Sequence, residues 1–379
     1  MDERDVQDLE RLFAQVEDPR VERTKRHRLR DIMILAICGV IGGAEGWVEI
    51  EEFGKAKEAW FTDLLGLANG LPSHDPFGRV FSLLDPKQCE ASFFQWVQGI
   101  TKTVKGVIAI DGKTLRRAHD ENAGKKAFHL VSAWAVENRV VLAQLATEEK
   151  SNEITAIPLL LRQWAWKGCI VTIDAMGTQT RMAAPGIEQD GDDALALKDT
   201  QGNLYDEGKA TVVLAETDGF TGGYWWEAER QVEKGHGRLE IREYWTLSDP
   251  QILADLDPEG KWHGLKGIGV VRAERRMEQK TTRETRSFLL SVSSLKPFAT
   301  AVRSHWGIEN SLHWVLDLAF REDEARVRLG HADEKLAVLR HISLTLLRQE
   351  RSSRVGIHAK RLKAGWDHQY LLRILDGVI

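Results

Sequence analysis

The sequence predicts an α/β protein in which a helical region precedes a region that contains a sheet. Apolar residues recur at helical spacing through roughly the first hundred residues, and short runs rich in β-branched residues follow from position 107. After that point, strand-like and helix-like runs alternate along the chain. We therefore expect a helical N-terminal domain over residues 1–100 and a second, α/β domain over residues 101–379.

The N-terminal helices are predicted from three apolar patterns. Residues 30–38 open a long apolar helix that ends near Gly42 and Gly43, and residues 47–64 and 77–84 repeat helical spacing. A stretch with Pro72 and Pro76 between the last two has turn chemistry. All-helical modules in this position commonly bind DNA ends, and we expect that role for the N-terminal domain.

The second region begins with a change from helical to strand periodicity. A hairpin is indicated around Glu137 and Asn138, and Pro158 lies in the N-terminal part of an amphipathic helix. The expected strands cover residues 107–111, 128–136, 139–146, 170–174 and 193–198, and the helix covers residues 155–166.

This order of strands and helices is that of an RNase H-like domain. In that arrangement the first and fourth strands lie side by side. Asp111 and Asp174 each end an apolar strand, so the fold would bring the two carboxylates together at the rim of the sheet.

A long segment separates Asp174 from the next candidate, Glu309. Residues 238–247 and 267–292 are rich in strand signals, and glycines supply turns between them. We expect a β-rich insertion at about 210–295, followed by helices from residue 297 to about 350.

Cysteine usage and the length of apolar runs indicate the cellular compartment, and the charge bears on DNA binding. Three cysteines show no CxxC spacing, and the longest apolar stretch, residues 32–41, is too short to span a bilayer. We therefore expect a cytoplasmic protein with no membrane partner. The net charge of −5 argues weakly against DNA binding, but residues 20–30 and 340–363 are locally basic.

Two carboxylates at adjacent strand ends suit divalent metal ions held against a phosphodiester. Each aspartate alone could instead cap a turn or a helix. A P-loop is excluded because five residues, and not four, separate Gly106 from Gly112 and Lys113. A haloacid-type phosphatase is excluded because it needs a second acid two positions after Asp111, where this chain has Lys113. Basic and polar neighbours favour a phosphate-rich ligand: Lys113, Arg116 and Arg117 after the first aspartate, and Thr178 and Gln179 after the second.

A third carboxylate lies in a helix-like segment at residues 303–314. His305, Glu309 and His313 recur every four residues on one face, opposite an apolar face. This spacing leaves three interpretations open: the third metal-binding acid, a zinc site, or a plain surface stripe.

These residues carry a family resemblance. The chain resembles the DDE transposases of bacterial insertion sequences, in the branch of H-repeat-associated proteins. The matching stretches run in order along nearly the whole chain: Asp18-Pro19-Arg20, Lys25-Arg26-His27, Trp47-Val48-Glu49-Ile50-Glu51-Glu52-Phe53, Ser73-His74-Asp75, Ala109-Ile110-Asp111-Gly112-Lys113, Thr172-Ile173-Asp174-Ala175-Met176-Gly177-Thr178-Gln179, Gly235-His236-Gly237-Arg238 and His305-Trp306-Gly307-Ile308-Glu309-Asn310.

The resemblance implies a metal-binding triad of Asp111, Asp174 and Glu309 that holds two Mg²⁺ ions, with Mn²⁺ as a substitute. It also implies transposon-end DNA and target DNA as partners and a homodimer in the synaptic complex, associated with the nucleoid when bound to DNA. Related transposases carry tyrosine, arginine and lysine around the glutamate, where this chain has Val302, His305 and Leu316.

Phosphate contacts are therefore expected from other groups near the glutamate and in the insertion. Trp225 and Trp226 would either stack on a flipped base or pack in the core. Strand alternation places residues 236, 238 and 242 on one face. The expected DNA contacts in these two regions are Arg303, His305, Asn310, His236, Arg238 and Arg242.

Two other functions remain open at this stage. One is a metal-dependent nuclease that cuts DNA without joining it. The other is a DNA-binding remnant of a transposase, which is favoured by the acidic pI and by Pro185-Gly186 in an expected helix.

Overall fold

A computed structural model describes most of the chain. The described residues are 13, 15–101, 103–119, 127–147, 153–175, 177–187, 190–198, 210, 213, 217, 226–235, 237–278 and 280–376, with side chains for all of these except 184–187. Met176, Trp225 and His236, which carried expectations from the sequence, lie outside the described residues.

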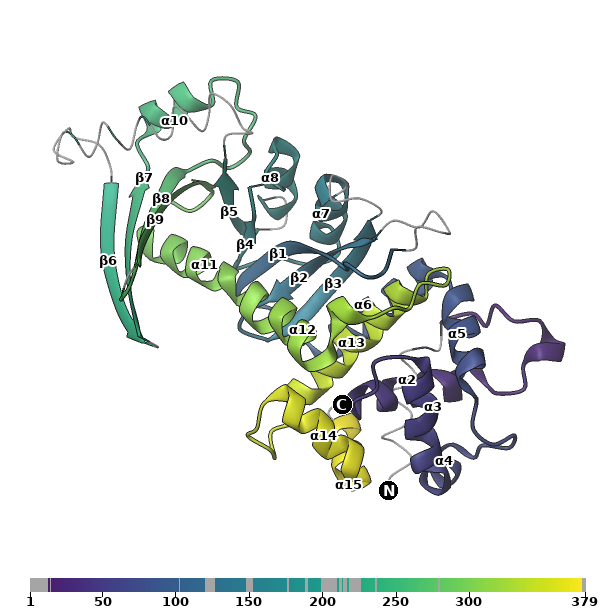
Figure 1. The fold of residues 1–379 in the computed structure, drawn as a ribbon. Coiled ribbons are helices and arrows are strands. Elements are labelled where there is room, and N and C mark those ends of the chain that lie inside the picture. Colours follow the sequence, from purple (N-terminus) through teal and green to yellow (C-terminus); the bar gives the residue numbers. More distant parts are fainter. Residues whose placement is uncertain are drawn as a thin grey trace.

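A nine-stranded sheet runs through the molecule in the order β3-β2-β1-β4-β5-β9-β8-β7-β6 (Figure 1). Its first five strands are those expected from the apolar runs. The strands are β1 (Gly106–Thr114), β2 (His129–Ala135), β3 (Val140–Thr147), β4 (Cys169–Ile173), β5 (Asp192–Leu197), β6 (Trp226–Gly235), β7 (Arg238–Leu247), β8 (Gly267–Met277) and β9 (Lys280–Leu290).

The part of the sheet from β3 to β5 has the RNase H-like arrangement. Strand β2 is antiparallel to both of its neighbours, while β1, β4 and β5 are parallel to one another. The prediction that the first and fourth strands pair is confirmed, because Ile110 of β1 lies opposite Ile173 of β4.

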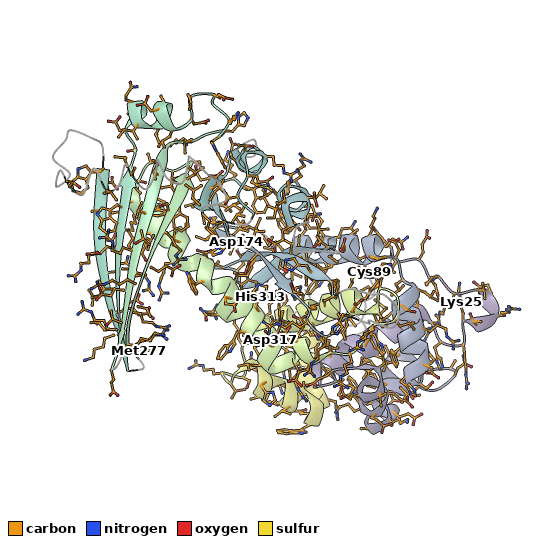
Figure 2. All side chains as sticks on the ribbon, turned by 45° about the horizontal axis from the view of Figure 1, so that its top comes forward. Lys25, Cys89, Asp174, Met277, His313 and Asp317 are labelled. Atoms are coloured by element: carbon orange, nitrogen blue, oxygen red, sulfur yellow. The ribbon has the colours of Figure 1, made fainter. Side chains whose placement is uncertain are left out.

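The β-rich segment extends the same sheet. Strands β6 to β9 form two long antiparallel hairpins within the predicted range, and β9 pairs with β5, with Ala194 opposite Leu290. Both hairpins reach well away from the rest of the molecule, and Met277 marks the tip of the second (Figure 2). Short helix α10 (Pro250–Leu256) connects them.

Helices cover both faces of the central strands. Helices α7 (Glu153–Leu161) and α8 (Thr180–Ile187) lie on one face, and α11 (Leu295–Ile308) crosses the other (Figure 1). Phe298 of α11 packs in a core with Val107 of β1, and Gly269 of β8 lets it approach closely, because a Cβ there would collide with the phenyl ring.

The predicted helical N-terminal region is confirmed by α2 (Leu29–Ile41), α3 (Trp47–Ala56), α4 (Glu58–Leu65), α5 (His74–Leu83) and α6 (Pro86–Ile100), preceded by a 3₁₀ turn η1 (Glu22–Thr24). Helix α2 is buried on all sides from Asp31 to Ile41, so it needs neighbours all round. Those neighbours include helices from the far end of the chain. They belong to the C-terminal set α12 (Trp314–Phe320), η5 (Glu322–Glu324), α13 (Ala332–Gln349), α14 (Ile357–Trp366) and α15 (His368–Leu375).

One apolar core therefore joins the beginning and the end of the sequence. Residues of α2 share a buried cluster with Leu339 and Ile342 of α13 and with Ala364 of α14. Within the described part of the chain, none of the helices has the length and apolarity to cross a membrane.

Candidate metal centre and adjoining groove

Asp111 lies where the pairing between β1 and β4 ends. The parallel register stops at Ile110 and Ile173, and Asp174 follows β4 directly. Strand β1 continues beside β2 as far as Thr114, so Asp111 is inside a strand and only the β4 side of it is open. The expectation that Asp111 ends its strand is wrong in this detail, but its carboxylate still lies beside the end of β4.

Each aspartate has one oxygen bonded to nearby backbone. The Gly112 N–H donates to Oδ1 of Asp111 over 2.9 Å, and the Gly177 N–H donates to Oδ1 of Asp174 over 3.0 Å. These bonds are the turn contacts that the capping interpretation expects. Since a carboxylate can accept about four bonds, they leave room for further ligands.

Burial raises the pKa of Asp111 to about 7. The Gly112 N–H opposes this shift, and the negative charges of Asp174, Glu153 and Glu309 add to it. A half-buried carboxylate close to three other acids is stabilised either by a proton or by a bound cation.

Helix α11 packs against β1, and the turn that follows it brings the third acid, Glu309, to Asp111. The helix widens into a single π turn, η4 (Glu309–His313), before α12 continues it. Single π turns inside α-helices occur frequently at functional sites. Ligand atoms of Asp111, Glu309 and His313 all lie within 4.8 Å of one another.

This donor set fits a divalent cation, because two carboxylates and an imidazole are ordinary metal ligands and their atoms converge on one point. Asp174 lies beside the group, where its charge acts on Asp111. Figure 2 shows Asp174 and His313 in the middle of the molecule, where α11 passes the sheet.

His305 faces a different part of the site. Its Nδ1 is 2.8 Å from the Thr172 hydroxyl of β4, and burial lowers its pKa to about 4 although the charge of Asp174 opposes the shift. The zinc site that the sequence left open, with His305, Glu309 and His313 on one ion, is not the group that the described residues bring together.

A second polar pair near Asp111 was missed by the sequence analysis. His129 of β2 and Glu153 of α7 are both buried and in contact behind Gly112, where any larger residue would collide with them. Thr114 contacts the other ring nitrogen of His129 at 2.9 Å. A lone glutamate at the start of a helix resembles any surface acid in the sequence, so no local signal could have identified it.

Lys113 lies in an internal ion cluster. Its amine contacts Asp317, Glu322 at 3.0 Å and Asp323 at 3.7 Å, and only 12% of its side chain is exposed. These three acids come from α12 and η5, more than two hundred positions later. The amine is therefore bound within the protein and is not available to a DNA phosphate, contrary to the expectation from the sequence.

The other expected contacts near the two aspartates differ in exposure. Arg116 and Arg117 are exposed, with Arg116 3.8 Å from Asp323. Thr178 is buried and donates to the Asp174 carbonyl over 3.0 Å, so it stabilises the turn after β4. Gln179 is half-buried beside it.

A groove of about 310 Å³ lies between the extended strands and α11. Arg238 and Arg242 share one face of β7, as predicted, and both border it. Arg303 and Asn310 of the opposite wall continue it towards Glu309. The complete lining is Arg238, Glu240, Ile241, Arg242, Tyr244, Val271, Ala273, Glu274, Arg275, Thr282, Glu284, Arg286, Val302, Arg303, Trp306 and Asn310.

Ion pairs inside the groove hold several of its arginines. Arg242 is paired with Glu240 and with Glu233 at 3.1 Å, whereas Arg303 reaches Glu233 at 2.9 Å and stays half exposed. Arg286 lies over the Trp306 ring at 5.2 Å, a pair that the sequence analysis did not identify. The groove thus offers arginines and an indole beside the helix that leads to Glu309.

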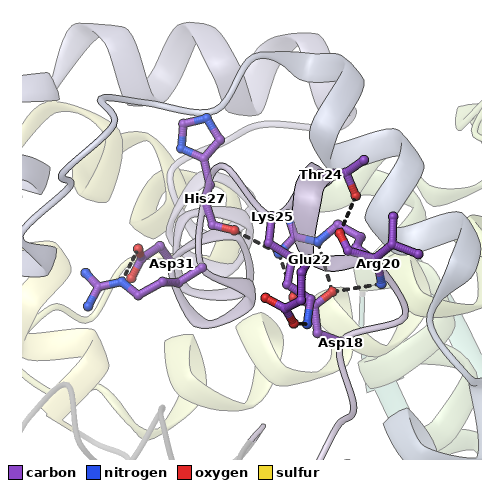
Figure 3. Close-up of polar contacts among 9 residues, drawn as sticks. Asp18, Arg20, Glu22, Thr24, Lys25, His27 and Asp31 are labelled. Atoms are coloured by element: carbon purple, nitrogen blue, oxygen red, sulfur yellow. Dashed lines mark hydrogen bonds and ion pairs between the residues drawn. The ribbon is translucent and has the colours of Figure 1, made fainter.

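Part of the N-terminal basic segment, residues 20–30, has a structural role, whereas Arg23 and Arg26 are exposed. Arg20 binds Asp18 through Nε at 2.9 Å and donates to the His27 carbonyl over 2.8 Å (Figure 3). Lys25 pairs with Glu22 (Figure 3), and Asp31 accepts a hydrogen bond from Nε of Arg28, the residue just before α2. The stretch around Asp18 and Arg20 therefore fixes the entry into α2.

The chain is similar in sequence to known protein families. A family model described as "Transposase DDE domain" matches residues 102–346, and one described as "DDE_Tnp_1-associated" matches residues 11–97. The H repeat-associated protein YhhI of Escherichia coli (strain K12), named as a transposase, is 39% identical over 93% of this chain and 93% of its own length.

YncI of Escherichia coli O157:H7, also named as a transposase, is 36% identical over 98% of this chain and 95% of its own length. Among solved structures, the piggyBac transposase synaptic complex with hairpin DNA matches 96% of this chain and 77% of its own at 9% identity, with a TM-score of 0.41. A likeness this low supports no conclusion about the present chain.

Proposed function

Because the chain belongs to the DDE transposase family, we propose that it cuts DNA at transposon ends and joins the freed strand to target DNA. The family resemblance seen in the sequence is confirmed by these matches, and the family suggests an enzyme that acts on DNA. The two reaction steps, the metal ions and the residues that carry them are our proposal.

The observation that supports this proposal is that Asp111 shares a group of close ligand atoms with Glu309 and feels the charge of Asp174. Asp111 and Asp174 come from paired parallel strands, and Glu309 comes from the π turn that crosses the opposite face. The raised pKa of Asp111 agrees with a site that carries excess negative charge. We propose Asp111, Asp174 and Glu309 as the ligands of divalent cations.

In the proposed reaction, a water molecule attacks a phosphorus atom at the transposon end and the bond to the 3′ oxygen breaks. The resulting 3′-hydroxyl then attacks a phosphodiester of the target, so one P–O bond forms as another breaks. Bound Mg²⁺ would activate the attacking oxygen and stabilise the leaving oxygen. His305, held by Thr172, would fix α11 against β4 and so keep Glu309 near Asp111.

We propose that DNA follows the groove beside α11. Arg303, Arg286 and Asn310 lie along its wall and are exposed or half-buried, so they are available to phosphate oxygens. Arg238 lies farther along the same groove and is also partly exposed. Arg242 is held by two glutamates and would orient the strand rather than bind a phosphate.

A cleavage and joining assay tests the function. The full chain is incubated with Mg²⁺, a labelled duplex carrying the ends that flank its gene, and a target plasmid. We expect nicked and joined products with the wild type. Asp111→Asn should reduce both by at least about a hundredfold while end binding is retained.

Asp63→Asn is the matched control, because Asp63 is an exposed aspartate of α4. Cleavage without joined product would replace the transposase with a metal-dependent nuclease. End binding without cleavage by the wild type would identify a catalytically inactive remnant. Undiminished cleavage by Asp111→Asn would refute the assignment of the site.

A further inference from the structure

His313 is a buried side chain without an explanation inside the protein. It is 4% exposed, and neither of its ring nitrogens has a hydrogen-bond partner among the described residues. Its Nε2 lies 3.6 Å from Oδ2 of Asp111, which is too long for a hydrogen bond. Buried polar atoms are nearly always paired, so this imidazole indicates a missing partner.

The surrounding groups do not supply that partner. The Lys113 amine, whose charge acts on His313, is bound by Asp317 and Glu322. On the other side, His129 is paired with Glu153 and contacts Thr114. Glu322 is paired with Lys113, and His341 contacts Gln144. The groups whose ligand atoms lie close to those of His313 are Asp111 and Glu309.

The spacing of these three groups suits a shared ion. Two ligands bonded to one cation at about 2.1 Å lie about 3 Å apart when adjacent and about 4.2 Å apart when opposite. The 3.6 Å between His313 and Asp111 falls between these limits. The π turn contributes directly, because it carries Glu309 at its start and His313 at its end.

We propose that His313 is a direct ligand of the divalent ion held by Asp111 and Glu309. This centre would then have one nitrogen donor and two carboxylate donors, and Asp174 is the remaining acid of the proposed triad. A nitrogen donor favours transition-metal ions over Mg²⁺, so the site should bind Mn²⁺ more tightly than Mg²⁺. The inference rests on the proposed function only in taking Asp111 and Glu309 as metal ligands.

Pulsed electron paramagnetic resonance of Mn²⁺ bound to the full chain without DNA tests this assignment. An imidazole ligand produces a coupling from its ¹⁴N nucleus to the Mn²⁺ electron spin. We expect that coupling in the wild type and its loss in His313→Gln, with Mn²⁺ affinity reduced about tenfold to a hundredfold. His358→Gln is the matched control, because His358 is an exposed histidine of α14, and it should retain the coupling.

A second variant guards against misfolding. His313→Asp replaces the nitrogen with an oxygen donor, so it should still bind Mn²⁺ but without the ¹⁴N coupling. A wild-type protein that binds Mn²⁺ with no ¹⁴N coupling overturns the proposal, as does a coupling that persists in His313→Gln. Both results are read without DNA cleavage. A chain that binds Mn²⁺ through His313 yet does not cut DNA would refute only the proposed function.

Discussion

Burial of single acidic side chains shifts their pKa values in this protein. Asp193 at the start of β5 is 5% exposed, and burial raises its pKa to about 7. The charge of Asp192 adds to this shift, while the contact with Ser291 and the charge of Lys266 oppose it. Asp193 lies on the far side of β4 from the proposed metal centre and provides a test of how the buried acids affect stability.

The folded protein holds a proton on Asp193 between about pH 4 and pH 7, whereas the unfolded chain releases it. This group's contribution to stability is therefore largest at low pH and is lost as pH rises through that window. We expect Asp193→Asn to raise the free energy of unfolding at pH 8 by about 2 kcal/mol relative to the wild type, with a much smaller gain at pH 5.

Thermal melts of the metal-free protein at both pH values measure this difference. Asp190→Asn is the control, since that side chain is 77% exposed. Equal gains at pH 5 and pH 8 would show that Asp193 does not titrate in this range.

Sequence patterns located residues whose role is local and missed those whose role depends on distant partners. Asp111 and Asp174 were predicted because each follows an apolar run, and the register of β1 and β4 then determines how they meet. Lys113 was assigned to DNA because it follows Asp111, but its partners come from α12 and η5. Glu153 had no signal at all, because a buried acid and a surface acid look alike in a sequence.

At the scale of elements, the groove between β7–β9 and α11 decides how DNA would approach the metal centre. Arg303 is its half-exposed arginine on α11, and its one contact at 2.9 Å is with Glu233 of β6. Each phosphate contact releases bound counterions, so its loss changes the salt dependence of binding. We expect Arg303→Ala to weaken binding of an end duplex and to reduce the slope of log K against log salt by about 1.

Binding is measured by fluorescence anisotropy over a range of salt concentrations, with EDTA present so that cleavage does not interfere. Arg354→Ala is the matched control, because Arg354 is an exposed arginine in the loop between α13 and α14. An unchanged slope for Arg303→Ala would place the DNA elsewhere on the molecule.

Most elements were predictable, and the exceptions have physical causes. Apolar runs and helical spacing located the central strands and the helices α2, α7 and α11 within a few residues. The pairing of β5 with β9 joins segments about a hundred residues apart, so no local pattern shows that the β-rich segment extends the sheet. The π turn at Glu309 was also unpredictable, since its residues have ordinary helical spacing.

At the scale of the whole molecule, the helices at the two ends of the sequence depend on one another. Arg361 of α14 donates to the Val40 carbonyl over 2.8 Å and to the Ala44 carbonyl over 3.1 Å, at the end of α2. It also donates to the Ala319 carbonyl of α12 and stacks on Phe320 with 4.2 Å to the ring centroid. This buried guanidinium ties together segments from both sides of the domain boundary predicted at residue 100.

We expect the full chain to unfold in a single transition, because these segments share one core. Arg361→Met should shift that entire transition and lower the free energy of unfolding by about 2–4 kcal/mol, since three buried carbonyls lose their donor. Denaturant unfolding followed by circular dichroism and by tryptophan fluorescence measures this, with the exposed Arg351→Met as control. Two separate transitions, of which only one moves in Arg361→Met, would show instead that the helical region and the catalytic region fold independently, as the sequence alone suggests.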